Sequence, residues 1–214
     1  MKTKTILMSV LIMLTLSSCN TTKSDIIKVG DIIQFGTYPW RVLDIQDGRA
    51  LIISENIIER KQYHHNWVQT SWADCSMREY LNGEFYNSVA FSDADRERIV
   101  QITNINEDNQ WYGDPAGEDT QDWIFLLSIS EVVRFFGDSG QLENRPYQTG
   151  HINDQFNSNR IATYEESANS WWLRSPGGYG DLASYVGTEG FVFIIGLGVS
   201  YQLFGMRPAL WVVM

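Results

Sequence analysis

An acidic loop between residues 106 and 122 carries a group of potential metal ligands. Its carboxylates are Glu107, Asp108, Asp114, Glu118, Asp119 and Asp122. Hard oxygen ligands at short spacing are those that Ca²⁺ prefers. The spacing differs from that of an EF-hand, because the place of the bidentate glutamate, counted from Asn104, is taken by Pro115. Clustered acids on a loop are usually solvated. We therefore assign no metal ligands and no cofactor, and keep Ca²⁺ as the ion that Asp119 and Asp122 would bind.

Two arginines lie inside apolar, strand-like segments. Arg174 follows the apolar residues 171–173, and Arg207 precedes the apolar residues 208–213. Arginine is seldom buried unless it is paired, and two parallel N–H···O bonds to a carboxylate make a strong pair. We expect a structural ion pair between Asp122 and either Arg174 or Arg207, which would fix the acidic loop.

Aromatic residues are abundant, with 8 Trp, 10 Tyr and 10 Phe. Rings that are exposed in a polar groove are suited to stacking on the C–H faces of sugars. Trp111, Tyr112 and Tyr179 lie in polar, loop-like sequence, as do Trp67 and Tyr147. We select the first three, with Asp119 and Asp122, as candidate ligand-binding residues. The tryptophans in strand-like segments are expected in the core: Trp40, Trp123, Trp171, Trp172 and Trp211.

Cys75 is the residue that could serve as a catalytic nucleophile. A nucleophilic thiol needs a base, and the histidines of the chain are His64, His65 and His151. Cys75 falls beside Trp72 on an expected helix, where a buried and inert thiol is commoner. We therefore assign no catalytic residue, and an enzyme that uses Cys75 or the acidic loop remains an alternative.

The first residues have the features of a secretory signal. Lys2 and Lys4 precede an apolar run over 6–16, which at about 11 residues is roughly half the length of a membrane-spanning helix. Residues 16–19, Leu-Ser-Ser-Cys, resemble the bacterial lipobox, in which the cysteine receives the lipid. We expect a signal peptide over 1–18, lipidation of Cys19, a tether over 19–27, and a secreted protein anchored to the bacterial membrane or cell envelope.

Composition restricts the class of protein. Hydrophobic residues make up 43% and charged residues 20% of the chain, so it can bury a core and is not mainly disordered. The formal net charge is −10, and no basic run is present. A nucleic-acid partner is therefore not expected.

The elements that would position these residues are short strands followed by short helices. Residues 32–35, 40–45 and 50–53 read as strands, and Asp47-Gly48 predicts a tight hairpin. A serine three residues before an acid predicts helix starts at Ser71, Ser92 and Ser128. The first helix should end at Asn82-Gly83 and the third at Gly137, with strands over 99–103 and 123–127.

From residue 171 onward glycine-rich sequence predicts strands joined by tight turns. The expected strands cover 171–174, 183–187, 191–195, 199–204 and 208–213. The whole reads as one α+β domain over residues 28–214, with antiparallel sheets and two or three short helices.

Several motifs occur together in the order and spacing of a known bacterial family. They are Gly30-Asp31, Tyr38-Pro39-Trp40, Trp72 with Cys75-Ser76, Tyr80-Leu81-Asn82-Gly83, Asp119-Thr120-Gln121-Asp122, Trp171-Trp172-Leu173-Arg174-Ser175-Pro176-Gly177 and Arg207-Pro208-Ala209-Leu210-Trp211. Over nearly the whole mature chain the sequence resembles the family called domain of unknown function 6273, typically found on secreted or surface-attached proteins. Its last motifs resemble those of C-type-lectin-like and sulfatase-modifying-type domains. That resemblance implies a C-type-lectin-like fold, in which the two chain ends pair in one sheet.

Three hypotheses follow for function. The first is a non-catalytic, lipid-anchored surface module that binds a glycan, a peptide or a protein. The second is a secreted enzyme that uses Cys75 or the acidic loop. The third is a structural lipoprotein of the envelope. The expected partner common to them is the membrane, through Cys19.

Overall fold

The computed structural model describes residues 26–147 and 149–214. The expected signal peptide, the lipidation site Cys19 and most of the expected tether lie outside these residues. Within them, no helix is long and apolar enough to cross a membrane.

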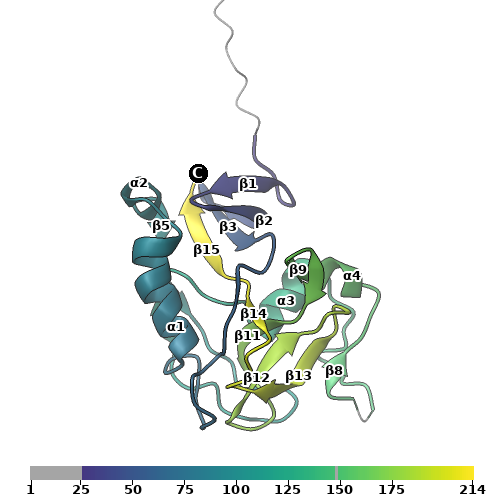
Figure 1. Ribbon diagram of the computed structural model, residues 1–214. Helices are drawn as coiled ribbons and strands as arrows, with labels where there is room; N and C mark the ends of the chain where they lie inside the picture. Colours follow the sequence, from purple (N-terminus) through teal and green to yellow (C-terminus); the bar gives the residue numbers. More distant parts are fainter. Residues whose placement is uncertain (1–25, 148) are drawn as a thin grey trace, which may run out of the picture.

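The first sheet joins the two ends of the described chain. Its strand order is β1-β2-β3-β15-β5, with all neighbours antiparallel. The bounds, in that order, are Ile32–Phe35, Tyr38–Gln46, Arg49–Ser54, Ala209–Val213 and Ile99–Val100. Asp47 and Gly48 both have positive φ, as a tight two-residue hairpin turn requires, so the predicted hairpin is confirmed. Figure 1 shows β15 beside β3, with the C-terminus close to β1.

Apart from β4, the second sheet is built from the C-terminal half, and it lies below the first in Figure 1. Its strand order is β4-β14-β11-β12-β13-β8, and β14 and β11 are parallel. The bounds, in that order, are Glu59–Arg60, Gly205–Met206, Trp171–Pro176, Leu182–Val186, Val192–Gly198 and His151–Ile152. Every residue of β11 is buried, as suits an apolar strand in the middle of a sheet.

Two small ribbons accompany the sheets. They are β6 (Ile102–Asn104) with β7 (Thr120–Asp122), and β9 (Ala162–Tyr164) with β10 (Ser167–Asn169). The expected strands over 123–127 and 199–204 are wrong as drawn. Phe125 makes only an isolated bridge to Ala209, and residues 199–204 form turns and bends, with β14 beginning only after them at Gly205.

The first helix differs from its prediction at both ends. α1 (Ser76–Tyr80) begins after Cys75, whose sulfur accepts from the Arg78 N–H, whereas Ser71 bonds to the side chain of Asp74. The helix continues past Gly83 as a wider π-helix, η1 (Leu81–Val89). Buried Leu81 and Phe85 hold this extension against the core, which outweighs the weak helix propensity of an Asn-Gly pair.

The other two helix starts are confirmed. α2 (Asp93–Arg96) and α3 (Ile129–Phe136) each begin with a reciprocal capping box, from Ser92 and Ser128. α3 ends at Gly137, whose φ is 123° and whose Cα lies so close to the Phe156 ring that a Cβ would clash with it. Phe156 is the N-cap of α4 (Asn157–Arg160), a short helix that the sequence did not predict.

The chain is thus one mostly β domain of the α+β class with antiparallel sheets and short helices, as expected. Four tryptophans are fully enclosed in its core, Trp40, Trp72, Trp171 and Trp172. Pairing of the chain ends agrees with the arrangement implied by the family resemblance, and a C-type-lectin-like fold stays a prediction.

Candidate functional site

Asp122, at the end of β7, is the centre of a buried polar cluster. Its side chain is fully buried, and its two oxygens accept hydrogen bonds from four side chains. Arg78 Nε donates to Oδ1 at 2.6 Å, and the donors to Oδ2 are Trp72 Nε1 (3.0 Å), Asn104 Nδ2 (2.8 Å) and Thr120 Oγ1 (2.7 Å). These contacts join α1 to the β6–β7 ribbon.

The expected pairing of Asp122 with Arg174 or Arg207 is therefore wrong. Arg78 is the partner because α1 lies against β7, and its guanidinium also bonds to the carbonyls of Ala73 and Gln121. The carboxylate is enclosed and fully used by protein donors, so Asp122 is a structural residue and not a surface ligand. Arg78 lies at an ordinary helix position in the sequence, and no local signal singled it out.

Arg174, on β11, has a different carboxylate partner. Its two terminal nitrogens bind both oxygens of Glu131, in the first turn of α3, and Nη1 also donates to the Leu126 carbonyl at 3.0 Å. Glu131 completes the capping box of α3 at the same time. The expectation that Arg174 forms a structural ion pair holds, but with Glu131.

Arg207, just before β15, is buried without an ion-pair partner among residues 26–147 and 149–214. Nε and Nη2 donate to the carbonyls of Ser54 and Glu55, at 3.0 and 3.1 Å. The guanidinium lies 5.0 Å from the ring centre of Trp171 and 5.4 Å from that of Phe136. The expected ion pair is therefore absent for Arg207.

The acidic loop is fixed by hydrogen bonds that its side chains make to backbone groups. Asn109, which sequence reasoning missed, is buried and donates to the carbonyls of Pro176, Gly177 and Ile194. Asp119, just before β7, is exposed and accepts from the Asn106 N–H, whereas Asp122 at the end of this strand is enclosed. No cluster of three or more potential metal ligands occurs among the described residues.

The predicted loop aromatics gather, but one arginine covers two of them. Arg145 stacks on Trp111 at 5.0 Å and on Tyr112 at 4.5 Å from the ring centres. Tyr112 also packs over Gly178, next to Tyr179, whose side chain is 67% exposed. Tyr179 is thus the one of these three rings that presents most of its surface to solvent, and their role in ligand binding stays a prediction.

A groove of about 660 Å³ lies at the end of the second sheet where β12 begins and β13 ends. Its apolar lining comes from Trp67, Leu182, Leu197, Tyr201 and Leu203. Trp67 is 70% exposed and Leu203 55% exposed, so the groove displays large apolar side chains to solvent. We call it the Trp67 groove. Exposed apolar surface gathered in a hollow is typical of an interaction site.

Trp67 is held in place at the groove. Its Nε1 donates to Oδ2 of Asp181 at 2.6 Å, which fixes the plane of the indole while leaving its surface exposed. Asp181 also lies close enough to Asp114 to affect it: burial first, and then the charges of Asp108 and Asp181, raise the pKa of Asp114. The groove is therefore apolar inside with negative charge at its edge.

Cys75 has the environment of an inert thiol. Its side chain is buried, and its sulfur lies 3.4 Å from both the Trp72 carbonyl and the Arg78 nitrogen. Burial raises the pKa of Cys75 to about 12, against hydrogen bonds from Arg78 and Tyr63 that act to lower it. The thiol is protonated at neutral pH, whereas a nucleophile needs the thiolate.

The histidines also have structural contacts. His64 Nδ1 accepts from the Ser76 N–H at 3.2 Å, at the start of α1, and His64 lies against His65. His151 stacks on Phe191, with ring centres 5.2 Å apart.

A family model described as "Domain of unknown function (DUF6273)" matches residues 47–214, so the chain belongs to this family. No curated protein and no solved structure matches the chain.

Proposed function

We propose that this member of the family is a non-catalytic binding module that holds a neutral glycan in the Trp67 groove. The observation that carries the proposal is the exposed, immobilised indole of Trp67. Its hydrogen bond to Asp181 reduces the conformational freedom that binding would otherwise cost, so the ring is prepared to stack on a sugar face.

The charges around the groove favour a neutral ligand. Asp181 lies directly beside Trp67, and Asp114 is close enough to Asp181 for the two charges to interact. An anionic ligand would be repelled by these carboxylates. A sugar chain contributes hydroxyl groups that can bond to carboxylate oxygens, together with an apolar face for the indole.

The arrangement of reactive groups supports binding over catalysis. Cys75 is buried and protonated, and the Asp122 carboxylate is enclosed by four donors. Neither lines the Trp67 groove. A groove that combines apolar lining with few polar groups is suited to recognition.

We propose further that the module is secreted and anchored through a lipid on Cys19, which would hold the groove at the surface of the membrane or envelope. The lipobox-like residues 16–19 support this. Cys19→Ser should release the protein from the membrane fraction, and equal retention after a high-salt wash would contradict the anchor.

The binding proposal is tested with the full-length chain on an array of neutral and acidic glycans and peptides. We expect neutral glycans to be bound, and Trp67→Ala to weaken their binding at least about tenfold, or about 1.4 kcal/mol. Asp181→Asn, which loosens the indole without removing it, should have a smaller effect in the same direction. Tyr147→Ala is the matched control, because it removes an 88% exposed aromatic ring that does not line the groove.

The other outcomes identify the alternatives. Binding of peptides alone, with the same loss in Trp67→Ala, would replace the glycan by a protein partner. Turnover of a bound compound would favour an enzyme. If Trp67→Ala and Tyr147→Ala bind alike, the groove is not the site.

A further inference from the structure

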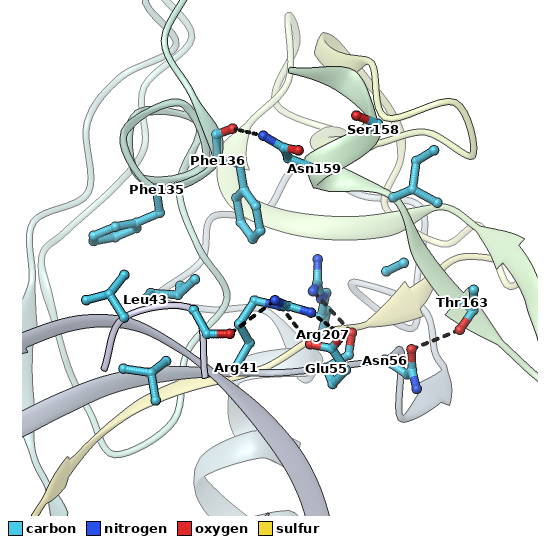
Figure 2. A pocket seen from close by; sticks show the side chains of 15 residues that line it. Arg41, Leu43, Glu55, Asn56, Phe135, Phe136, Ser158, Asn159, Thr163 and Arg207 are labelled. Atoms are coloured by element: carbon cyan, nitrogen blue, oxygen red, sulfur yellow. Dashed lines mark hydrogen bonds and ion pairs between the residues drawn. The ribbon is translucent and has the colours of Figure 1, made fainter. Parts of the chain in front are cut away.

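A second pocket lies between the first sheet and the short helices, and Arg207 forms part of its wall. It has a volume of about 520 Å³ and is bordered by β2, the end of β3, the end of α3, α4 and β9. Figure 2 shows the guanidinium of Arg207 at the base of this space, with Phe136 and Asn159 opposite. It shares no lining residue with the Trp67 groove. We call it the Arg207 pocket.

Arg207 has an unused hydrogen-bonding group. Its side chain is 2% exposed, and Nη1 has no hydrogen-bond partner, although Nε and Nη2 are satisfied by backbone carbonyls. A buried donor without a partner costs free energy, and a buried charge without a counter-charge costs more. Arg160 Nε is the other such atom among the described residues, but Arg160 is already paired with Asp154.

The charge balance of the pocket is positive. Its charged lining residues are Arg41, Glu55 and Arg207. Glu55 is bound at both oxygens by Arg41, with Nε at 2.8 Å from Oε2, and is the only carboxylate among them. One net positive charge is left. Burial lowers the pKa of Arg207 to about 10; the charge of Glu55 acts to raise this pKa, and the charge of Arg41 acts to lower it further. The guanidinium is therefore still protonated at neutral pH.

We propose that the Arg207 pocket binds a small organic carboxylate, whose charge is balanced by Arg207 and Arg41 and whose apolar part lies against Phe136 and Leu43. A single negative charge matches the one positive charge that the pocket leaves uncompensated. The lining also includes Phe135 and Ile161, whose side chains are accessible to solvent, which favours a ligand with a hydrocarbon or aromatic part over a bare inorganic anion.

The pairing of Arg41 with Glu55 makes a specific pattern of mutational effects. Both side chains are partly exposed, 34% and 23%, so they can be changed without opening the core. Arg41→Gln frees the Glu55 carboxylate to approach Arg207 and repel a ligand anion. Glu55→Gln removes the competing carboxylate and leaves two cations for the ligand. The two changes should therefore shift carboxylate affinity in opposite directions.

The full-length chain is titrated with phenylacetate and with its neutral counterpart phenylacetamide, and binding is measured by calorimetry and by the shift in melting temperature. We expect phenylacetate to bind at least tenfold more tightly. Its affinity should fall about tenfold in Arg41→Gln and rise several-fold in Glu55→Gln. Arg49→Gln is the control for net charge, since Arg49 is exposed and lies outside the pocket, and it should leave the affinity unchanged.

A further variant tests the location without disturbing buried groups. Ser158 is exposed and lies in the lining of the pocket, so Ser158→Phe should block entry and abolish phenylacetate binding in a normally folded protein. Arg207→Gln should also abolish binding, but it removes bonds to Ser54 and Glu55 and is interpreted only if the variant folds.

Several results would overturn the proposal. These are equal affinity for phenylacetate and phenylacetamide, tighter binding of inorganic phosphate than of phenylacetate, or no phenylacetate binding up to about 10 mM. Equal effects of Arg41→Gln and Arg49→Gln would show that Arg207 only tethers the backbone carbonyls. Loss of glycan binding in Trp67→Ala bears on the other groove, so the two proposals fail separately.

Discussion

The Asp122–Arg78 pair allows a quantitative test of how this fold is held together. Arg78→Met keeps the aliphatic stem but leaves a fully buried carboxylate with only three neutral donors. Breaking a buried ion pair from one side typically costs about 3–5 kcal/mol. Because Arg78 is itself 26% exposed, we expect the lower end, about 3 kcal/mol.

Substitution of the other partner, Asp122, should cost less stability. Asp122→Asn can place its amide oxygen where Oδ2 now accepts from Trp72, Asn104 and Thr120. The amide nitrogen then faces the Arg78 Nε–H and cannot accept from it, so the charge-assisted bond from Arg78 is lost, at about 2 kcal/mol. The double variant has neither a buried charge nor a missing counter-charge, so it should be about 2 kcal/mol more stable than the sum of the single losses predicts.

The assay is urea unfolding of the four proteins that make up the double-mutant cycle, with the free energy of unfolding as readout. The matched control is the exposed pair of Arg134 and Asp44, at 3.3 Å and with Arg134 65% exposed, changed to Met and Asn. Its coupling should be under about 0.5 kcal/mol. Additive losses at Asp122 and Arg78, or a greater loss in Asp122→Asn than in Arg78→Met, would refute the reasoning.

Two further predictions concern titratable groups. Burial raises the pKa of Cys75 from 9.0 to about 12, so at pH 8 its thiolate fraction should be about a thousandfold smaller in the native chain than in the unfolded one. Labelling of Cys75 by a disulfide reagent should be slower in the native chain by the same factor. Labelling at the same rate in both states would contradict its buried position. Asp154 is the second case: burial alone would raise its pKa, but bonds from Arg160 and Ser139 outweigh this and hold it below the usual range. A lowered carboxylate pKa stabilises the fold above the unfolded value of about 3.9, and this contribution is lost as the pH falls through the lower, folded value. Asp154→Asn should therefore flatten the fall in urea stability between pH 5 and pH 2, as judged against Asp93→Asn at an exposed site, and an unchanged pH slope would contradict the pair.

Elements with strong local chemistry could be predicted from the sequence. The hairpin turn needs positive φ at two adjacent residues, and Asp-Gly is one of the pairs that adopt this conformation most readily. The capping boxes of Ser92 and Ser128 are satisfied within four residues of chain. Such signals depend on residues that are neighbours along the chain, so the predicted turns and helix starts do not depend on tertiary contacts.

Elements that depend on distant contacts could not be predicted. β8 is only His151–Ile152 and is defined by its pairing with β13, and α4 follows Phe156, whose ring packs on Gly137. The continuation of α1 into η1 depends on Asn82, which bonds to residues 123 and 124 far along the chain. No pattern of neighbouring residues in the sequence indicates which distant residues will pair in this way.

The candidate site shows the same division. Exposure of Trp67 and Tyr179 followed from their polar surroundings in sequence. That Trp67 is fixed by Asp181 over a groove could not follow, because the two residues are 114 positions apart. Sequence also selected Trp111 and Tyr112, which Arg145 covers, so it did not separate the available rings from the covered ones. The structure shows that Trp67 is the ring held in a hollow.

The arginines give the clearest view of this limit. An arginine in an apolar segment indicates burial, and burial was found for Arg174 and Arg207 alike. The two nevertheless differ, because Arg174 is neutralised by Glu131 whereas Arg207 has carbonyls, aromatic rings and one unused nitrogen. Sequence can indicate that a cation is buried, but only the arrangement of its neighbours shows whether its charge is already balanced. The proposed ligand site at Arg207 rests on that difference. Among the described residues, Asp154 and Glu131 neutralise the buried Arg160 and Arg174, whereas the buried Arg207 has no carboxylate partner and lines an open pocket.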